Sequence, residues 1–193
     1  LSIKYFKLAI SKNNKFWQAY YNIGLLYIEI RKFKLALINF INVKDLIPNN
    51  NNAYVYVFIG DCYYKTKFYE EAYKNYLNAI SINPNLFEAY NGMANYFYEK
   101  NQLLLAKKNY EKAITINSNF SKAFYNLGKI NKEFQNFEKA ITCFDKAIEL
   151  NPNYELAKFA KSTCFLYLRN FAQGWKYYEF REHENYLEKI LKR

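Results

Sequence analysis

Four short segments decide the fold of this chain: Asn22-Ile23-Gly24, Phe58-Ile59-Gly60, Gly92-Met93-Ala94 and Asn126-Leu127-Gly128. Their third residues lie 36, 34 and 34 residues apart, and each third residue is small. Self-similarity at a period of this length is typical of repeat architectures, in which each unit packs on its neighbours. The sequence therefore predicts an array of structural repeats.

Other positions recur in the same register when the repeats are counted from Trp17, Ala53, Phe87, Ser121 and Glu155. Position 20 is small in every repeat: Ala36, Ala72, Ala106, Ala140 and Gly174. Position 24 is aromatic in every repeat: Phe40, Tyr76, Tyr110, Phe144 and Tyr178. All three prolines stand at position 32, where the missing N–H ends a helix: Pro48, Pro84 and Pro152. The small positions 8 and 20 predict close approach of two helix backbones, and the ring at position 24 fills the space between repeats.

This pattern resembles the tetratricopeptide repeat over nearly the whole chain. The resemblance implies an all-α fold, a right-handed superhelical α-solenoid of antiparallel helix pairs, helix A followed by helix B. Helices are expected at 17–30, 33–46, 53–66, 69–82, 87–100, 103–116, 121–134, 137–150, 155–168 and 171–184. The repeats occupy 17–50, 53–86, 87–120 and 121–154, with a degenerate capping repeat at 155–184 and a charged tail at 185–193. The Asn residues that flank Pro84 and Pro152 favour a turn and a cap, and the two extra residues in 49–52 predict a loop.

Composition agrees with a chain of helices joined by short turns. The 193 residues include only five Gly and three Pro, too few for a sandwich or barrel that needs a turn every 8–12 residues or so. Hydrophobic residues make up 51% and aromatic residues 21%, which excludes a disordered chain.

The two ends of the chain depart from the full repeat. Residues 1–16 fit the template only as helix B of a truncated preceding repeat, with Phe6 at position 24 and Ala9 at position 27. Because a solenoid repeat needs a neighbour or a polar cap over its apolar face, we expect the sequence to be an excerpt of a longer protein.

The stretch from Arg169 to Arg181 is similar to the GDF-x-x-GW-x-x-YE-x-R ending of many bacterial tetratricopeptide arrays. Some of those arrays precede domains like the O-linked N-acetylglucosamine transferases or other glycosyltransferases. The structural interpretation is a capping repeat in which Trp175 and Tyr178 cover the last apolar face. The functional alternative is an array that recruits substrates to a catalytic domain outside this sequence.

Residues that would support catalysis or metal binding are scarce. His183 is the only histidine, so no histidine-based triad or multi-histidine metal site can form within the chain. Cys62, Cys143 and Cys164 form no CxxC pair and indicate buried, reduced thiols. Glu70-Glu71 and similar pairs are expected on outward faces, where they solubilise the helix. The sequence predicts no catalytic residue, no metal site and no cofactor, so the chain is not expected to be an enzyme.

The formal net charge of +11 at first favours nucleic acid or an anionic membrane as a partner. Lysine supplies most of that charge, arginine is scarce, and no run of five or six basic residues exists. Because Lys, Asn, Ile, Tyr and Phe have AT-rich codons, base composition explains much of the excess. We therefore predict neither nucleic-acid nor membrane binding, and no apolar run is long enough to span a bilayer. A cytoplasmic location is expected, although a targeting segment upstream of Leu1 would not be visible.

In arrays of this kind helix A lines the concave groove, at positions 2, 5, 6, 9, 12 and 13 of each repeat. Asparagine amides bind an extended backbone, and tyrosine rings give rigid apolar area at low entropy cost. The predicted peptide-binding residues are Tyr21, Asn22, Tyr54, Phe58, Asn91, Asn95, Tyr98, Tyr125, Asn126 and Lys129. Val57 also stands at such a position. Asn22 and Asn126 occupy position 6, as do asparagines that contact peptide in the O-linked glycosyltransferase arrays, but Phe58 and Gly92 interrupt that ladder.

Two functions fit these observations. The first is a protein-interaction scaffold that holds an extended or helical segment of a partner in the groove. The second is the substrate-recruiting array of a larger glycosyltransferase. Position 5 carries no lysine, which disfavours a clamp for chaperone tails, whereas Lys122, Lys129 and Lys132 favour an acidic peptide at the fourth repeat.

Overall fold

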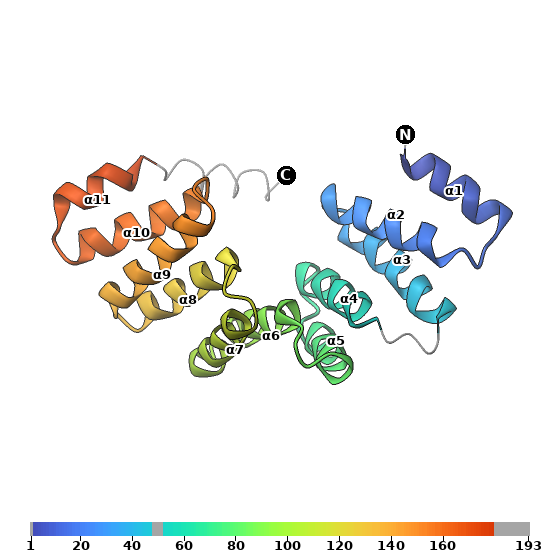
Figure 1. Cartoon of the computed structure of the whole chain (residues 1–193), viewed down its shortest axis with the longest axis horizontal. Helices are drawn as coiled ribbons and strands as arrows, with labels where there is room; N and C mark the ends of the chain where they lie inside the picture. Colours follow the sequence, from blue (N-terminus) through green and yellow to red (C-terminus); the bar gives the residue numbers. More distant parts are fainter. Residues whose placement is uncertain (1, 48–51, 180–193) are drawn as a thin grey trace. The chain divides into compact units, whose positions relative to one another are not determined.

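The computed structural model describes residues 2–47 and 52–179, and over these residues the chain is helical with no strand. Figure 1 shows the helices in chain order. Their bounds are α1 (Ser2–Lys12), α2 (Trp17–Glu29), α3 (Phe33–Leu46), α4 (Ala53–Lys65), α5 (Tyr69–Ile82), α6 (Phe87–Glu99), α7 (Leu103–Ile116), α8 (Ser121–Glu133), α9 (Phe137–Leu150), α10 (Glu155–Tyr167) and α11 (Phe171–Tyr178). The predicted all-α fold is confirmed.

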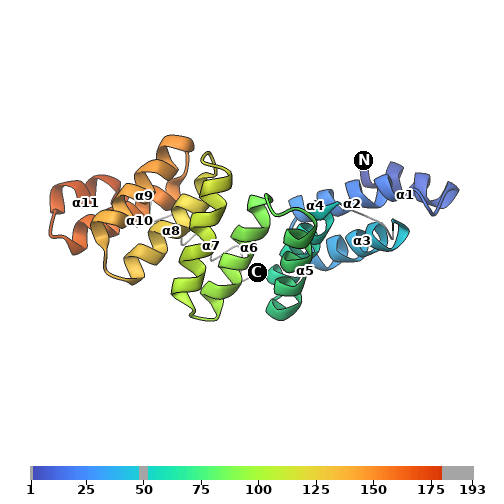
Figure 2. The same ribbon diagram turned by 60° about the horizontal axis from the view of Figure 1, so that its bottom comes forward.

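The chain divides into two compact units, Leu1–Asn101 (unit 1) and Gln102–Arg193 (unit 2). In unit 1, α2 packs on α3, α3 on α4, α4 on α5 and α5 on α6. Figure 1 shows α2 above α3 and α4 above α5, so the A helices lie on one side of these pairs. In unit 2, α7 to α11 follow one another side by side in chain order (Figure 2).

The aromatic ring at position 24 is the centre of the packing between helices. Phe40, Tyr76 and Phe144 are fully buried, and Tyr110 is nearly so. The small residue at position 8 faces this ring, because a Cβ added at Gly24 would lie 2.7 Å from the Phe40 ring. The prediction that small residues allow close approach is therefore refined: at position 8 the close neighbour is a ring and not a backbone.

Tyr76 in unit 1 has glycine on two sides. A Cβ added at Gly60 on α4 would lie 2.7 Å from the Tyr76 ring, and one added at Gly92 on α6 would lie 2.4 Å from it. Gly92 stands at position 6 of the next repeat, where the sequence pattern gives it no packing role. The structure supplies that role, since any side chain at position 92 would displace the buried ring.

Each A helix ends one residue before the predicted end, and the following turn has one recurring geometry. Position 15 has positive φ in all five repeats, at Arg31 (58°), Lys67 (67°), Asn101 (56°), Gln135 (57°) and Arg169 (58°). In the first of these turns the N–H of Lys32 donates to the carbonyl of Tyr27 at 2.8 Å, and the N–H of Arg31 donates to that of Ile28 at 2.9 Å. This pair of bonds is the Schellman motif, which normally uses glycine at the left-handed position.

The turns from helix B to the next helix A are closed by asparagine side chains. Oδ1 of Asn83 accepts from the N–H of Asn85 at 3.0 Å, and Oδ1 of Asn151 accepts from that of Asn153 at 3.2 Å. These are Asx turns and not the predicted helix caps, because α6 and α10 begin without a side-chain cap. The loop prediction at 49–52 concerns residues outside those described except Asn52, which caps α4 through the N–H of Tyr54.

The last described helix differs from its prediction. α11 ends at Tyr178 and not at 184, and residues 180–193, including Arg181 and His183, lie outside the described part of the chain. Tyr178 contacts Phe159 with ring centroids 5.7 Å apart. Trp175 is 59% exposed, and its ring contacts that of Tyr178 with centroids 5.1 Å apart. That Trp175 covers the last apolar face stays a prediction.

The three cysteines are free thiols. Cys62 and Cys164 are buried as predicted, whereas Cys143 is half-buried. Burial raises the pKa of Cys62 to about 12 and that of Cys164 to about 11. Among the described helices, none is long and apolar enough to cross a membrane.

Candidate functional site: the A-helix faces

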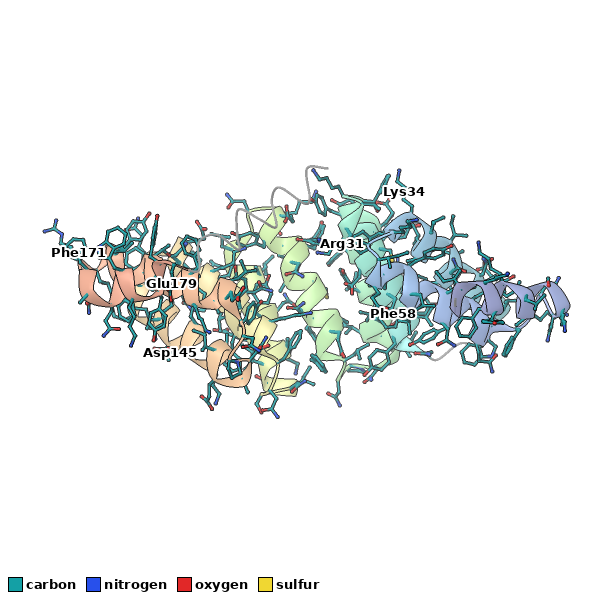
Figure 3. All side chains as sticks on the ribbon, turned by 90° about the horizontal axis from the view of Figure 1, so that it is seen from above. Arg31, Lys34, Phe58, Asp145, Phe171 and Glu179 are labelled. Atoms are coloured by element: carbon teal, nitrogen blue, oxygen red, sulfur yellow. The ribbon has the colours of Figure 1, made fainter. Side chains whose placement is uncertain are left out.

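In unit 1, the partly exposed face of α2 and α4 is built on aromatic rings. Phe58 on α4 (labelled in Figure 3) stacks on Phe40 with centroids 5.0 Å apart. The ring of Tyr21 on α2 makes T-shaped contacts with both of these rings, with ring centroids 5.9 Å apart in each pair. Tyr54 is 44% exposed and lies close enough to Tyr21 to act on it electrostatically. Burial, with a smaller contribution from Tyr54, raises the pKa of Tyr21, so the Tyr21 phenol stays neutral at physiological pH.

Carboxylates on this face are held by tyrosine hydroxyls. The hydroxyl of the buried Tyr76 donates to Oδ1 of Asp61 at 2.8 Å, and the hydroxyl of Tyr64 donates to Oε1 of Glu99 at 2.9 Å. Desolvation is the main cause that raises the pKa of Tyr76 well above its ordinary value, followed by the charge of Asp61. Asp61 and Glu99 are exposed, and these hydrogen bonds orient their carboxylates on the face.

Glu88, at position 2 of α6, is the least solvated carboxyl group of this face. It is half-buried, and its Oε2 atom is buried with no hydrogen-bond partner among the described residues. Its neighbours in the chain, Leu86 and Ala89, belong to a buried cluster with Val57. Desolvation raises the pKa of Glu88.

The predicted polar residues of unit 1 include amides on α2 and α6. The amide Nδ2 of Asn22 donates to the carbonyl of Gln18 at 2.8 Å, within its own helix. Asn91, Asn95 and Tyr98 are half-buried on α6. Val57 is only 3% exposed, so its expected place on the binding surface is wrong: it belongs to the core beneath that surface.

In unit 2, the corresponding face on α8 is basic. Asn126 and Lys129 are half-buried, and Lys122 is exposed. Nζ of Lys132 donates to Oγ1 of Thr163 on α10 at 3.5 Å. Tyr125 contacts Tyr154 with ring centroids 5.0 Å apart and Phe144 at 5.9 Å, so it is anchored in the apolar cluster of unit 2.

Unit 2 has a hollow of about 400 Å³ that the sequence did not predict. It is lined by Lys132, Glu133, Gln135, Phe137 and Tyr167. The rings of Phe137 and Tyr167 stack at 4.9 Å with an interplanar angle of 7°, and Tyr167 remains 68% exposed. Tyr167 stands at position 13 of the fifth repeat, so extending the groove positions to that repeat would have found it.

Glu70 is exposed, as expected from the sequence, but it also makes contacts that the sequence did not predict. Oε1 of Glu70 on α5 pairs with Nζ of Lys100 at 2.7 Å, and Oε2 accepts from the hydroxyl of Tyr96 at 2.9 Å. Tyr96 in turn stacks on Tyr73 at 4.6 Å. These contacts join the start of α5 to the end of α6.

No group of three or more His, Cys, Asp or Glu side chains that could hold a metal ion occurs in the described part of the chain. The site residues are aromatic rings, amides, carboxylates and lysines on helix faces. Such a surface is suited to binding a chain by hydrogen bonds, ring contacts and charge.

Helix pairs with a small residue at position 8 against a buried ring at position 24 define an α-helical repeat protein. The chain belongs to the tetratricopeptide repeat family. Tetratricopeptide repeat models match residues 18–50, 87–120 and 121–154, and a TPR repeat model matches 60–101.

Solved structures share this fold at low sequence identity. In the crystal structure of the APC/C hetero-tetramer Cut9–Hcn1, the match has a TM-score of 0.84 at 12% identity and covers 92% of this chain and 35% of that chain. PilF of Pseudomonas aeruginosa gives 0.75 at 19% identity, covering 85% and 74%. YrrB, described as a TPR protein with an unusual peptide-binding site, gives 0.61 at 19%, covering 91% and 89%. Among curated proteins, none matches this sequence.

Proposed function

We propose that the chain is a protein-interaction scaffold that binds an extended or helical segment of a partner protein on its A-helix faces. The observation that carries the proposal is the ordered strip of half-exposed rings and amides on α2, α4 and α6. Rings already fixed by their neighbours lose little conformational entropy on binding, which favours affinity per contact. The tetratricopeptide fold is typically a non-catalytic scaffold, and YrrB is a family member described as having a peptide-binding site.

The alternative, a substrate-recruiting array of a glycosyltransferase, depends on a ladder of position-6 asparagines. Phe58 and Gly92 interrupt this ladder, and both have packing roles against the rings of Phe40 and Tyr76. Asn22 already donates to its own helix. These contacts favour the general scaffold over the specialised array.

The lysines of α8 support an acidic segment as the ligand of unit 2. Lys122, Lys129 and Lys132 stand at positions 2, 9 and 12, so they lie along one side of the helix. Cationic side chains on one surface attract an anionic segment and slow its departure when contacts are close.

The test is retention of a random library of 12-residue peptides by the immobilised full chain. The triple variant Asn91→Ala, Asn95→Ala, Asn126→Ala is expected to retain several-fold less peptide than the unmodified chain, because each amide supplies hydrogen bonds of about 1 kcal/mol. The matched control is Asn39→Ala, Asn75→Ala, Asn109→Ala on the B helices, where each amide donates to the carbonyl four residues earlier. Equal retention by all three proteins would contradict the proposal.

A further inference from the structure

We propose that the A-helix face of unit 1 docks a partner segment bearing lysine or arginine, with the cationic group paired to Glu88. This inference rests on the proposed function and names the chemistry of the ligand for one of the two faces. It commits unit 1 to a basic segment, in contrast to the acidic segment favoured for unit 2.

The A-helix face of unit 1 is acidic at its groove positions. The groove positions of α2, α4 and α6 carry four carboxylates, Glu29, Asp61, Glu88 and Glu99. They carry one lysine, Lys65, whose Nζ lies 5.8 Å from the centroid of the Tyr64 ring. An anionic segment placed against this face would be repelled, whereas a cationic segment is attracted to it.

The carboxyl group of Glu88 is partly desolvated on this face. Desolvation destabilises a carboxylate, and it raises the pKa of Glu88 more than the hydrogen bond from the backbone of Glu88 itself lowers it. Its buried Oε2 has no partner among the described residues, although Asp61 and Glu99 each accept a tyrosine hydroxyl. An ammonium or guanidinium group docked on this face would pair with the half-buried carboxyl group of Glu88 through a charge-assisted hydrogen bond.

Aromatic side chains on α2 and α4 form part of the same A-helix face. Tyr21, Tyr54 and Phe58 offer partly exposed rings, and Tyr54 is 44% exposed. Aromatic faces attract cations and also accept the apolar stem of a lysine or arginine side chain. A metal ion is a weaker candidate, since the described residues hold no group of three ligands for one.

The experiment measures binding of the full chain to two synthetic pools of 12-residue peptides by fluorescence anisotropy. The pools share length and aromatic content, and one carries lysine where the other carries glutamate. The lysine pool is expected to bind the unmodified chain more tightly than it binds Glu88→Gln, by about tenfold, since a charge-assisted bond is lost. Glu71→Gln on α5 is the matched control and is expected to bind as the unmodified chain does.

Two further variants separate this inference from the general scaffold. Tyr54→Ser is expected to weaken binding of the lysine pool, and Lys122→Ala with Lys129→Ala is expected to leave it unchanged. If Tyr54→Ser weakens binding and Glu88→Gln does not, the scaffold stands and the cation pairing is overturned. If neither Tyr54→Ser nor Glu88→Gln changes binding of the lysine pool, the face of unit 1 is not the docking surface. Glu88→Gln removes a charge with little change in side-chain volume. Thermal unfolding of each variant shows whether its fold is intact.

Discussion

The A-helix faces of the two units carry opposite charge on the same repeat template. In unit 1 the groove positions hold four carboxylates, two of which accept hydrogen bonds from tyrosine hydroxyls. In unit 2 the groove positions of α8 hold Lys122, Lys129 and Lys132 with one carboxylate, Glu133. Positions 8, 20 and 24 form the packing between helices and are alike in all repeats. The surface positions are not constrained by that packing, so the two units can differ in the charge of the partner that each binds.

The buried rings differ in the same way. Tyr76 in unit 1 lies between two glycines and donates to a carboxylate on the face. Phe144 in unit 2 has Gly128 on one side and shares its cluster with Ala160, which stands at the position of Gly92. The packing of unit 1 is therefore coupled to its polar face, whereas that of unit 2 is apolar at this position.

Gly92→Ala is expected to have the largest effect on this comparison. The added Cβ would lie 2.4 Å from the Tyr76 ring, which Gly60 confines from α4. We expect a loss of about 2 kcal/mol in the free energy of unfolding, because overpacking outweighs the better helix propensity of alanine. Urea denaturation followed by circular dichroism measures it. Ala160→Gly in unit 2 is the reverse exchange and should cost about 1 kcal/mol through backbone entropy. Stabilisation by Gly92→Ala would show that the ring can move.

Tyr76→Phe is expected to have the next largest effect, a loss of about 1 kcal/mol, because it removes the hydrogen bond to Asp61. The same denaturation experiment measures this change. The comparison variant is Phe144→Tyr, which would bury a hydroxyl without a matching carboxylate at position 9, where unit 2 has Lys129. If neither Phe144→Tyr nor Tyr76→Phe changes the free energy of unfolding, the hydrogen bond between Tyr76 and Asp61 does not stabilise unit 1.

Replacing a left-handed turn residue with glycine is expected to stabilise either unit by about 0.5–1 kcal/mol. Lys67→Gly tests unit 1 and Gln135→Gly tests unit 2, at φ of 67° and 57°. The gain arises because glycine adopts positive φ without steric cost. Thermal unfolding should show a higher midpoint for both variants. A similar gain from Lys32→Gly, one residue further on at φ of −87°, would contradict this reason.

The smallest expected effect concerns the acid limb of stability. Hydrogen bonds from Lys100 and Tyr96 lower the pKa of Glu70 in the folded chain. Its contribution is therefore present above the unfolded pKa of about 4.3, and it is lost as the pH falls through the lower folded value. Glu70→Gln should reduce the stability difference between pH 6 and pH 3, as measured by urea titration at each pH. Lys100→Gln should reduce it too, whereas an unchanged difference in both variants would contradict the ion pair.

The repeat register predicted the helices closely because it depends on a few positions that every repeat needs. Proline at position 32 and asparagine beside it mark the end of helix B, and each B helix from α3 to α9 has its predicted bounds. The ends of the A helices were one residue off because Arg31, Lys67 and Gln135 give no compositional sign of a left-handed turn.

The candidate site could be predicted only as a set of positions. Val57 and Glu88 both stand at groove positions of A helices. Val57 is nevertheless buried in the core, whereas Glu88 is half-buried with one buried carboxyl oxygen. Burial of this kind depends on the side chains of the adjoining helix pair, which a single repeat does not contain. The ion pair of Glu70 with Lys100 was missed for the same reason, since it joins helices of two repeats.

The buried thiols give each unit its own reporter of local opening. With a pKa of about 12 for Cys62 and about 11 for Cys164, almost none of either thiol is ionised at neutral pH. An alkylating reagent will therefore react with each of these cysteines mainly when the surrounding helices separate. The labelling rate of Cys62 reports the opening of unit 1 and that of Cys164 the opening of unit 2, with no change to the sequence.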